Sequence, residues 1–311
     1  MRGKALELGR VAARRPVEAA LVGALAIVFS GILYRYADVS PETGAFFRCL
    51  YALPPLWLLA RWEDRRVGPR PRRLRAWAWL AGAFLSVDLL LWHHAIEAVG
   101  AGLATVLANT QVVLVGLIAW VVLRERPAGS SLFAIPLAGA GVVLISGALE
   151  QGAYGDDPAL GAFLGLLAGL AYTGLLLTLR QGSRDLRRVA GPLYDATLAA
   201  TVVLLPVGLA VGGLDLLPAL SAHAWLGLLA LSSQVAAWLL ITLSLPRLPA
   251  VVTSILLTLQ PVGSVLFAAL LLAERPSLLQ FLGTAAILAG LLIASAGRRG
   301  GDELEPVAEP A

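Results

Sequence analysis

The chain has 311 residues, of which 58% are hydrophobic and only 14% charged, and its mean hydropathy is +0.80. Soluble domains carry about 25% charged residues, so this composition excludes a soluble globular protein and leaves no room for a large aqueous domain. The net charge of +4 does not indicate a nucleic-acid partner, because the basic residues lie in short stretches between apolar runs.

Ten apolar runs follow one another along the chain, separated by charged or glycine- and proline-rich breaks. A helix of about 20 apolar residues crosses a bilayer. The first run follows basic residues, as in a signal peptide, but it ends in Tyr34-Arg35-Tyr36 without a small-residue cleavage site, so we expect a retained helix. The sequence predicts an all-α membrane protein with ten transmembrane helices, near 17–36, 43–61, 76–97, 101–123, 130–149, 160–180, 190–212, 223–245, 248–272 and 277–296.

The basic residues predict the orientation of these helices, because Lys and Arg are retained on the cytoplasmic side. With the N-terminus inside, the cytoplasmic segments hold 21 of the 24 basic residues. Only Arg35 and Arg275 fall outside, and Arg48 lies within the second helix. We therefore expect a multi-pass protein of the cell membrane with both termini in the cytoplasm.

An internal repeat appears at an offset of 149 residues. When 101–146 is laid on 250–295, 13 of 46 positions are identical without a gap, including Gln111 with Gln260. Five helices per repeat is an odd number, so the second half must enter the membrane inverted, a construction typical of secondary transporters. We expect a cytoplasmic tail over 1–16, five-helix repeats over 17–149 and 160–296, an external linker over 150–159 and a cytoplasmic tail over 297–311.

The segments that follow the fourth and ninth helices resemble each other and a known family. They read Leu123-Arg124-Glu125-Arg126-Pro127 and Leu272-Ala273-Glu274-Arg275-Pro276, and glycine-rich helices follow both, over Leu137–Ser146 and Ile287–Ser295. With Gln260-Pro261 in helix nine, the chain resembles the EamA-type proteins of the drug/metabolite transporter superfamily over about 17–296. The resemblance implies ten helices in two repeats and gradient-driven export or exchange of amino acids, other metabolites or drugs, without ATP hydrolysis. It also implies that Arg48 corresponds to the family's Arg near the start of helix two.

Several polar side chains fall at the same depth, near the middle of their helices. Such groups are costly in hydrocarbon and should face the bundle interior, where a transporter binds its substrate. The alternative is that they join helices through hydrogen bonds worth about 0.6 kcal/mol each. The residues that we expect to form the cavity are Ser30, Asp88, Gln111, Thr173, Gln234 and Gln260, with Trp92 and Trp238 beside them as cavity walls or core.

Asp88 is the candidate for proton coupling. No Lys or Arg on a helix is expected at its depth, so hydrocarbon would favour its neutral form and let it carry a proton. His93, His94 and Glu97 follow toward the external end of the same helix. We weigh a gate or proton relay against interfacial packing for the two histidines, and a metal site is not expected because no second ligand pair is found.

Arg48 and Pro261 are candidates for a gate or hinge. Arg48 lies about one turn inside its helix and could snorkel outward to pair with Glu42 or Asp38, or it could attract an anionic substrate. Pro261 removes a backbone donor beside Gln260 and predicts either a hinge or a static kink.

Three other classes compete with a transporter. An enzyme is disfavoured because no phosphate-binding glycine loop with a Lys, no HExxH motif and no aspartate pair at one depth occurs. A channel is disfavoured because the polar layer is asymmetric, and a structural membrane protein remains an alternative. We expect no cofactor. The expected partners are a small-molecule substrate, the lipid bilayer and, as an open alternative, a second copy of the chain.

Overall fold

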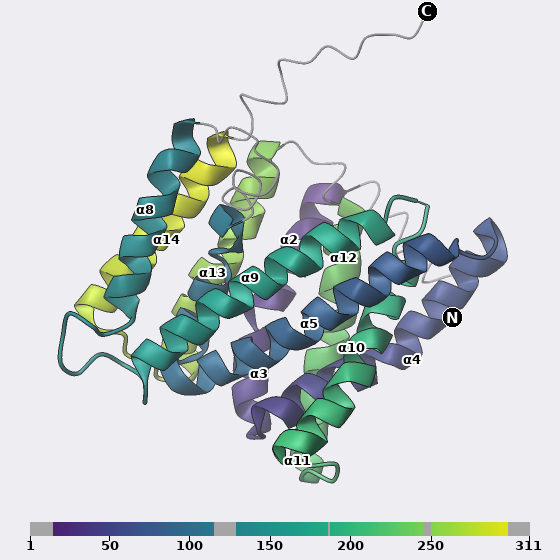
Figure 1. Ribbon diagram of the computed structural model, residues 1–311, viewed down its shortest axis with the longest axis horizontal. Coiled ribbons are helices and arrows are strands. Elements are labelled where there is room, and N and C mark those ends of the chain that lie inside the picture. Colours follow the sequence, from purple (N-terminus) through teal and green to yellow (C-terminus); the bar gives the residue numbers. More distant parts are fainter. Residues whose placement is uncertain (1–14, 115–128, 186, 245–249, 298–311) are drawn as a thin grey trace, which may run out of the picture.

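The computed structural model describes residues 15–114, 129–185, 187–244 and 250–297. These residues form helices and turns, and no strand occurs among them (Figure 1). The helices are α2 (Pro16–Val28), α3 (Ser30–Ala37), α4 (Pro41–Val67), α5 (Arg72–Val99), α6 (Ala101–Ala108), α8 (Gly129–Ile145), α9 (Pro158–Gly182), α10 (Ala190–Val211), α11 (Leu220–Leu229), the π-helical segment η1 (Ala230–Ala237), α12 (Trp238–Ser244), α13 (Ala250–Leu271) and α14 (Leu278–Gly297).

The helix starts have local causes in the sequence. Ser40 precedes Pro41, and its Oγ accepts a hydrogen bond from the N–H of Thr43 at 3.3 Å. Asp157 precedes Pro158 in the same way, and its carboxylate accepts from the N–H of Leu160 at 2.9 Å. Proline at the first helical position and an oxygen just before it are the usual signals of a helix N-terminus. The observed helices therefore begin close to the predicted ones.

Some predicted helices are interrupted or altered within their length. The first breaks at Phe29 between α2 and α3, and α6 ends at Ala108 before a turn at Asn109 and Thr110. The predicted helix 223–245 consists of α11, η1 and α12, with a π-helical middle. By contrast, Pro261 lies inside an unbroken α13. Irregular backbone at membrane depth is tolerated where it is buried in protein or lines a cavity.

Hydrogen bonds between connecting segments define two faces of the bundle. On the arginine-rich face, which comprises 61–75, 180–185 and 187–188, Arg188 donates to the carboxylate of Asp64 at 2.8 Å. On the opposite face, formed by the connections near 38–40, 100, 146–157, 212–219 and 272–277, the N–H of Tyr154 donates to Oε1 of Gln280 at 2.9 Å. The helices run between these two faces.

Five of the described helical segments are long and apolar enough to cross a membrane: Pro16–Ala37, Arg72–Val99, Pro158–Gly182, Ala190–Val211 and Leu220–Ser244. Shorter apolar helices cover Ala101–Leu114, Phe133–Ile145, Thr258–Leu271 and Leu278–Ala294. The all-helical, multi-pass part of the expectation is thereby confirmed. The count of ten crossings and the inversion of the halves stay predictions.

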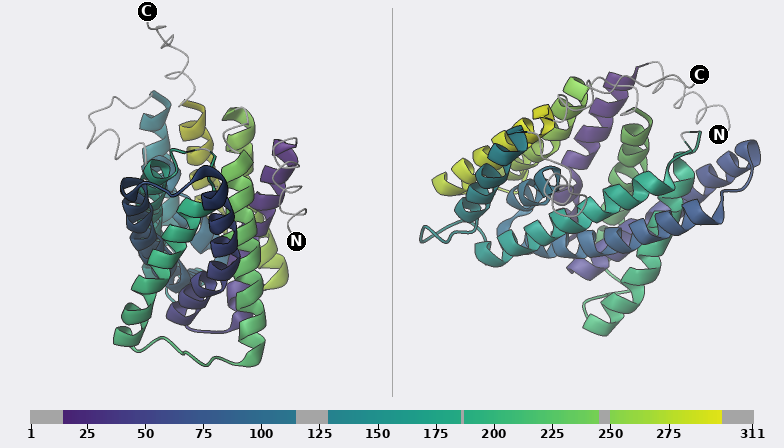
Figure 2. Two further views of the ribbon diagram at one scale, coloured as in Figure 1. Left: turned by 90° about the vertical axis from the view of Figure 1, so that its right-hand side faces the viewer. Right: turned by 45° about the horizontal axis from the view of Figure 1, so that its top comes forward.

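The closest packing is between helices that lie side by side, α5 with α9 and α8 with α14 (Figures 1 and 2). Glycines permit this approach. A Cβ on Gly141 would lie 2.6 Å from the carbonyl oxygen of Gly283, and a Cβ on Gly283 would lie 2.6 Å from that of Gly141. Small residues at such contacts are the usual means of packing helices in a membrane.

Candidate functional site

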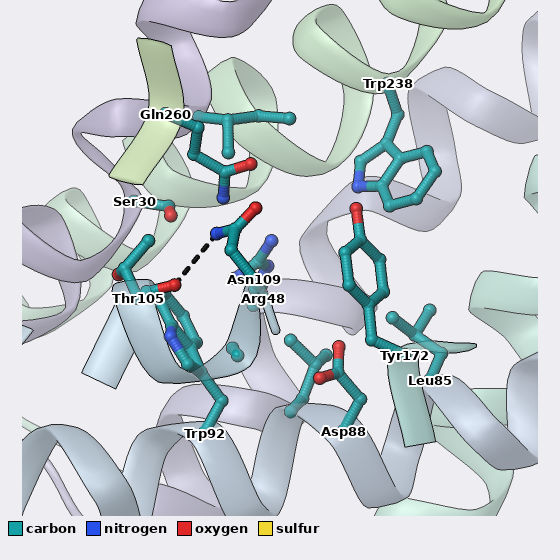
Figure 3. A pocket seen from close by; sticks show the side chains of 13 residues that line it. Ser30, Arg48, Leu85, Asp88, Trp92, Thr105, Asn109, Tyr172, Trp238 and Gln260 are labelled. Atoms are coloured by element: carbon teal, nitrogen blue, oxygen red, sulfur yellow. Dashed lines mark hydrogen bonds between the residues drawn. The ribbon is translucent and has the colours of Figure 1, made fainter. Parts of the chain in front are cut away.

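A cavity of about 50 Å³ lies in the bundle where helices from both predicted halves meet (Figure 3). This volume has room for a few water molecules. Six of the residues expected to form a site line it: Ser30, Arg48, Asp88, Trp92, Trp238 and Gln260. The other lining residues are Ile27, Leu85, Leu89, Thr105, Ala108, Asn109 and Tyr172.

Arg48 faces this cavity, and the expectation that it would snorkel outward is wrong. Its side chain is 6% exposed, and Nε donates a hydrogen bond to Oε1 of Gln234 at 3.2 Å. The guanidinium carbon lies 5.7 Å from the centroid of the Trp92 ring. No other hydrogen bond or ion pair of Arg48 is found among the described residues, so its terminal amino groups are available to a solute. Helix α4 turns this position inward because its neighbours α5, η1 and α10 all pack against it.

Asp88 projects from α5 into the same cavity (Figure 3). The expectation that no cation shares its depth is wrong, because Arg48 lines the cavity with it and the two charges interact electrostatically. They do not form an ion pair within 4.0 Å, and no hydrogen bond of Asp88 occurs in the part of the chain that the structure describes. The cavity therefore holds two opposite charges that approach each other without contact.

Gln234 does not line the cavity, but its side chain accepts the hydrogen bond from Arg48. It is fully buried in η1, and its amide nitrogen donates to Oγ1 of Thr197 on α10 at 3.4 Å. Gln111 and Thr173 are also buried outside the lining, and Thr173 donates its hydroxyl to the carbonyl oxygen of Gly169 at 2.9 Å. In this conformation none of the three lines the cavity, and the hydrogen bonds of Gln234 and Thr173 stabilise the surrounding helices.

The histidines after Asp88 are engaged elsewhere. His93 is fully buried, stacked on Tyr34 with ring centroids 4.1 Å apart, and its Nδ1 lies 3.3 Å from the carbonyl oxygen of Pro41. His94 pairs with Glu42 at 3.1 Å, and Glu97 accepts a hydrogen bond from the Tyr34 hydroxyl at 2.8 Å. His93, His94 and Glu97 thus have different hydrogen-bond partners, although His93 and Glu97 both contact Tyr34. The described residues contain no group of His, Cys, Asp and Glu that could hold a metal ion.

Three polar lining residues escaped the sequence analysis: Thr105, Asn109 and Tyr172. Asn109 stands two residues before Gln111 and Tyr172 directly before Thr173, so in these two cases the sequence indicated a polar residue nearby but not the one that lines the cavity. The side-chain nitrogen of Asn109 donates to the carbonyl oxygen of Thr105 at 2.8 Å, just where α6 ends (Figure 3). In the same figure the amides of Asn109 and Gln260 and the carboxylate of Asp88 point toward one space.

A second polar centre lies on the arginine-rich face. Asp195 on α10 is fully buried and bound by Arg70 at 2.8 Å and by Arg75 at 3.3 Å. The carboxylate of Glu63 accepts from the N–H groups of Val189, Ala190 and Gly191, at distances of 2.7–2.9 Å. These contacts connect the start of α10 to α4 and α5, and none of the residues involved lines the cavity.

With this geometry described, comparison with known proteins assigns a family. A model of the EamA-like transporter family matches the chain twice, over residues 16–147 and 159–296. The chain belongs to the EamA-like transporter family. This family consists of membrane transporters of the drug/metabolite transporter superfamily.

The fold comparison agrees with this family. A solved structure described only as "Crystal structure of protein" resembles the chain with a TM-score of 0.60 and 14% sequence identity. The match covers 93% of this chain and 99% of the other, so the similarity concerns the fold as a whole. No curated protein matches the chain.

The motif on which the EamA resemblance rests has a structural role in the second half. The carboxylate of Glu274 is 4% exposed and accepts from the N–H groups of Ala101 and Gly102, at 2.6 Å and 3.1 Å. It therefore caps α6, the helix that carries Thr105 and Asn109 to the cavity. The first-half motif 123–127 lies outside the described residues.

Proposed function

We propose that this protein is a secondary active transporter that moves a small solute through the cavity by alternating access. The observation that carries the proposal is that Arg48 and Asp88, opposite charges that form no ion pair among the described residues, line one cavity with Trp238 and Gln260 of the second half. Buried charges are rare within membranes and mark solute or ion pathways. A carrier whose site lies between two repeats can expose that site to each side in turn.

The irregular helices around the cavity support movement rather than a rigid scaffold. Phe29 separates α2 from α3 beside Ser30, and η1 is continuous with Trp238. Pro261 follows Gln260 and cannot donate a backbone hydrogen bond, so we propose it as the hinge of α13. π-Helical turns and broken helices occur frequently at functional sites.

The proposed arrangement has ten crossings in two inverted repeats, over 17–149 and 160–296, with 150–159 as an external linker. The arginine-rich face would then be cytoplasmic, since Arg and Lys are retained inside. The tails 1–16 and 297–311 would lie on that side of the cell membrane. Cysteine-accessibility labelling of introduced cysteines at Arg73 and Asp156, both exposed and on opposite faces, tests this orientation. Labelling of position 73 in intact cells by a membrane-impermeant reagent would contradict it.

The solute is a small metabolite, an amino acid or a drug-like compound, and the direction is export or exchange. Because Arg48 shares the cavity with Asp88, a proton on Asp88 is not the only way to balance its charge. We propose that a proton occupies Asp88 when the solute leaves, which would couple the two movements. Neither the cavity nor the family indicates a cofactor or an enzymatic reaction.

A thermal-shift screen of the purified protein against amino acids, amines and common toxicants tests the function. Any compound that raises the melting temperature is then tested for counterflow in proteoliposomes. We expect saturable counterflow that is lost in Asp88→Asn and retained in Asp156→Asn, a change of an exposed carboxylate outside the cavity. Flux that rises linearly with concentration without saturation would indicate a channel and overturn the proposal.

A further inference from the structure

The cavity presents one positive and one negative group, and neither forms an ion pair with any residue that the structure describes. Among the described residues, Arg48 forms a hydrogen bond only through Nε, to Gln234, and its side chain lines the cavity. Asp88 lines the same space without a hydrogen bond or ion pair among the described residues. Buried charges within membranes are usually paired, so two opposite charges that line one cavity without an ion pair between them are suited to binding a charged solute.

The two groups differ in the ligand that each prefers. A guanidinium with free terminal amino groups binds a carboxylate through two parallel hydrogen bonds, and such charge-assisted pairs are among the strongest in proteins. Gln234 keeps this guanidinium in place because it is itself fully buried and bonded to Thr197. An aspartate carboxylate only accepts hydrogen bonds when ionised, so its natural partner is an ammonium group with three donors.

The remaining walls restrict the rest of the solute. Aromatic rings of Trp92, Tyr172 and Trp238 face the cavity, together with the amides of Asn109 and Gln260 (Figure 3). The volume of about 50 Å³ is well below the roughly 300 Å³ at which drug-sized pockets begin. The cavity at this volume therefore suits a short apolar group. An aromatic solute would require it to expand, and a large drug would require it to expand several-fold.

We propose that the solute is a small zwitterion whose carboxylate is bound by Arg48 and whose ammonium group is bound by Asp88. This inference rests on the proposed function, since it takes the cavity to be the transport site. It assigns a separate role to each charge and predicts that a compound with only one of the two charges is a poor ligand. A zwitterion leaves neither side chain unpaired, whereas a monoamine leaves Arg48 and a monocarboxylate leaves Asp88 without a partner.

Equilibrium binding to the wild-type protein in detergent micelles tests the inference. The probes are L-alanine with ethylamine and propionate, and L-phenylalanine with phenethylamine and 3-phenylpropionate. We expect at least one of the two amino acids to bind at least tenfold more tightly than both of its single-charge analogues. If an analogue binds as tightly as the amino acid, or if neither amino acid binds, the inference is wrong.

Variants assign the charges to the two residues. Arg48→Gln should remove the preference for the amino acid over the amine, and Asp88→Asn should remove its preference over the carboxylate. The matched controls, Arg73→Gln and Asp156→Asn, change exposed residues outside the cavity and should keep the wild-type order. Unchanged preferences in both cavity variants would overturn the assignment. The ranking by the wild-type protein decides the inference even if a cavity variant fails to fold.

Counterflow distinguishes this inference from the proposed function. If a single-charge amine shows saturable counterflow while neither amino acid binds, the transporter proposal stands and the zwitterion inference fails. If an amino acid binds with the expected preferences but shows no counterflow, the binding site stands and the transport proposal fails.

Discussion

Replacing Glu274 tests whether the family motif stabilises the helix that carries the cavity. Its buried carboxylate accepts from the first two N–H groups of α6, at 2.6 Å and 3.1 Å. A buried donor left unsatisfied costs about 1–3 kcal/mol. Glu274→Ala leaves two donors without an acceptor, and because the site lies in a connection near the surface, water can replace part of the loss. We therefore expect a decrease of about 2–4 kcal/mol in the free energy of unfolding.

Glu274→Gln separates charge from hydrogen bonding. The amide keeps one acceptor oxygen but turns its NH2 group toward the second donor, and it loses an anion worth about 0.3–1 kcal/mol at a helix N-terminus. We expect about half the loss seen with alanine. The free energies are measured by titration with SDS in mixed micelles, followed by tryptophan fluorescence.

Glu18 provides the matched control, because its carboxylate is exposed and, within the described part of the chain, pairs with Arg15 alone, at 3.2 Å. Glu18→Ala should change the free energy of unfolding by less than about 0.5 kcal/mol. If Glu274→Ala costs no more than Glu18→Ala, the cap does not stabilise α6 and the explanation of the motif is refuted.

Three further predictions follow from individual contacts. A Cβ on Gly141 would lie 2.6 Å from the backbone of α14, so Gly141→Ala should destabilise the protein by about 1–3 kcal/mol in the same titration. Gly139 on the same helix is the control, because a Cβ there meets nothing within 4 Å. Gly139→Ala should therefore be neutral or slightly stabilising. Gln234→Leu removes the acceptor of a buried guanidinium at 3.2 Å and should cost about 1–3 kcal/mol; an unchanged stability would show that the bond is dispensable. The hydrogen bond from Arg187 lowers the pKa of Asp185 from 3.8 to about 2. The difference in stability between wild type and Asp185→Asn, measured by thermal unfolding, should therefore reach its full value above pH 3.8 and vanish as the pH falls through about 2. A difference that persists at lower pH would contradict this linkage.

Hydropathy alone predicted the helical segments well, because whether a segment prefers lipid or water depends mainly on its own composition. The predicted helix 160–180 is observed as Pro158–Gly182, and 190–212 is observed as Ala190–Val211. Proline and capping residues refined the starts because a helix N-terminus is satisfied by nearby side chains. The breaks were harder to predict, since Phe29 and the residues of η1 carry no local sequence signal of irregular backbone.

The composition of the polar layer was predictable, but its individual members were not. Asp88 and Gln260 line the cavity as expected, whereas Asn109 lines it in place of Gln111. The turn at Asn109 and Thr110 separates these two residues, so the spacing along the predicted unbroken helix does not give the directions of their side chains. The depth of a residue in the membrane can be estimated by counting from the end of its helix. The side of the helix that faces the cavity depends on which other helices pack against it.

The sequence by itself determined a multi-pass helical membrane protein with an internal repeat, because apolar runs and repeated residues are properties of the chain. Only the tertiary structure decided that Arg48 turns inward onto Gln234 and enters the cavity of Asp88. A lone arginine near a helix end can reach either the membrane interface or the interior of the bundle, and the sequence does not distinguish these two orientations. The packing of α4 against α10 and η1 selects the interior by placing a buried acceptor there, and this contact creates the two-charge site.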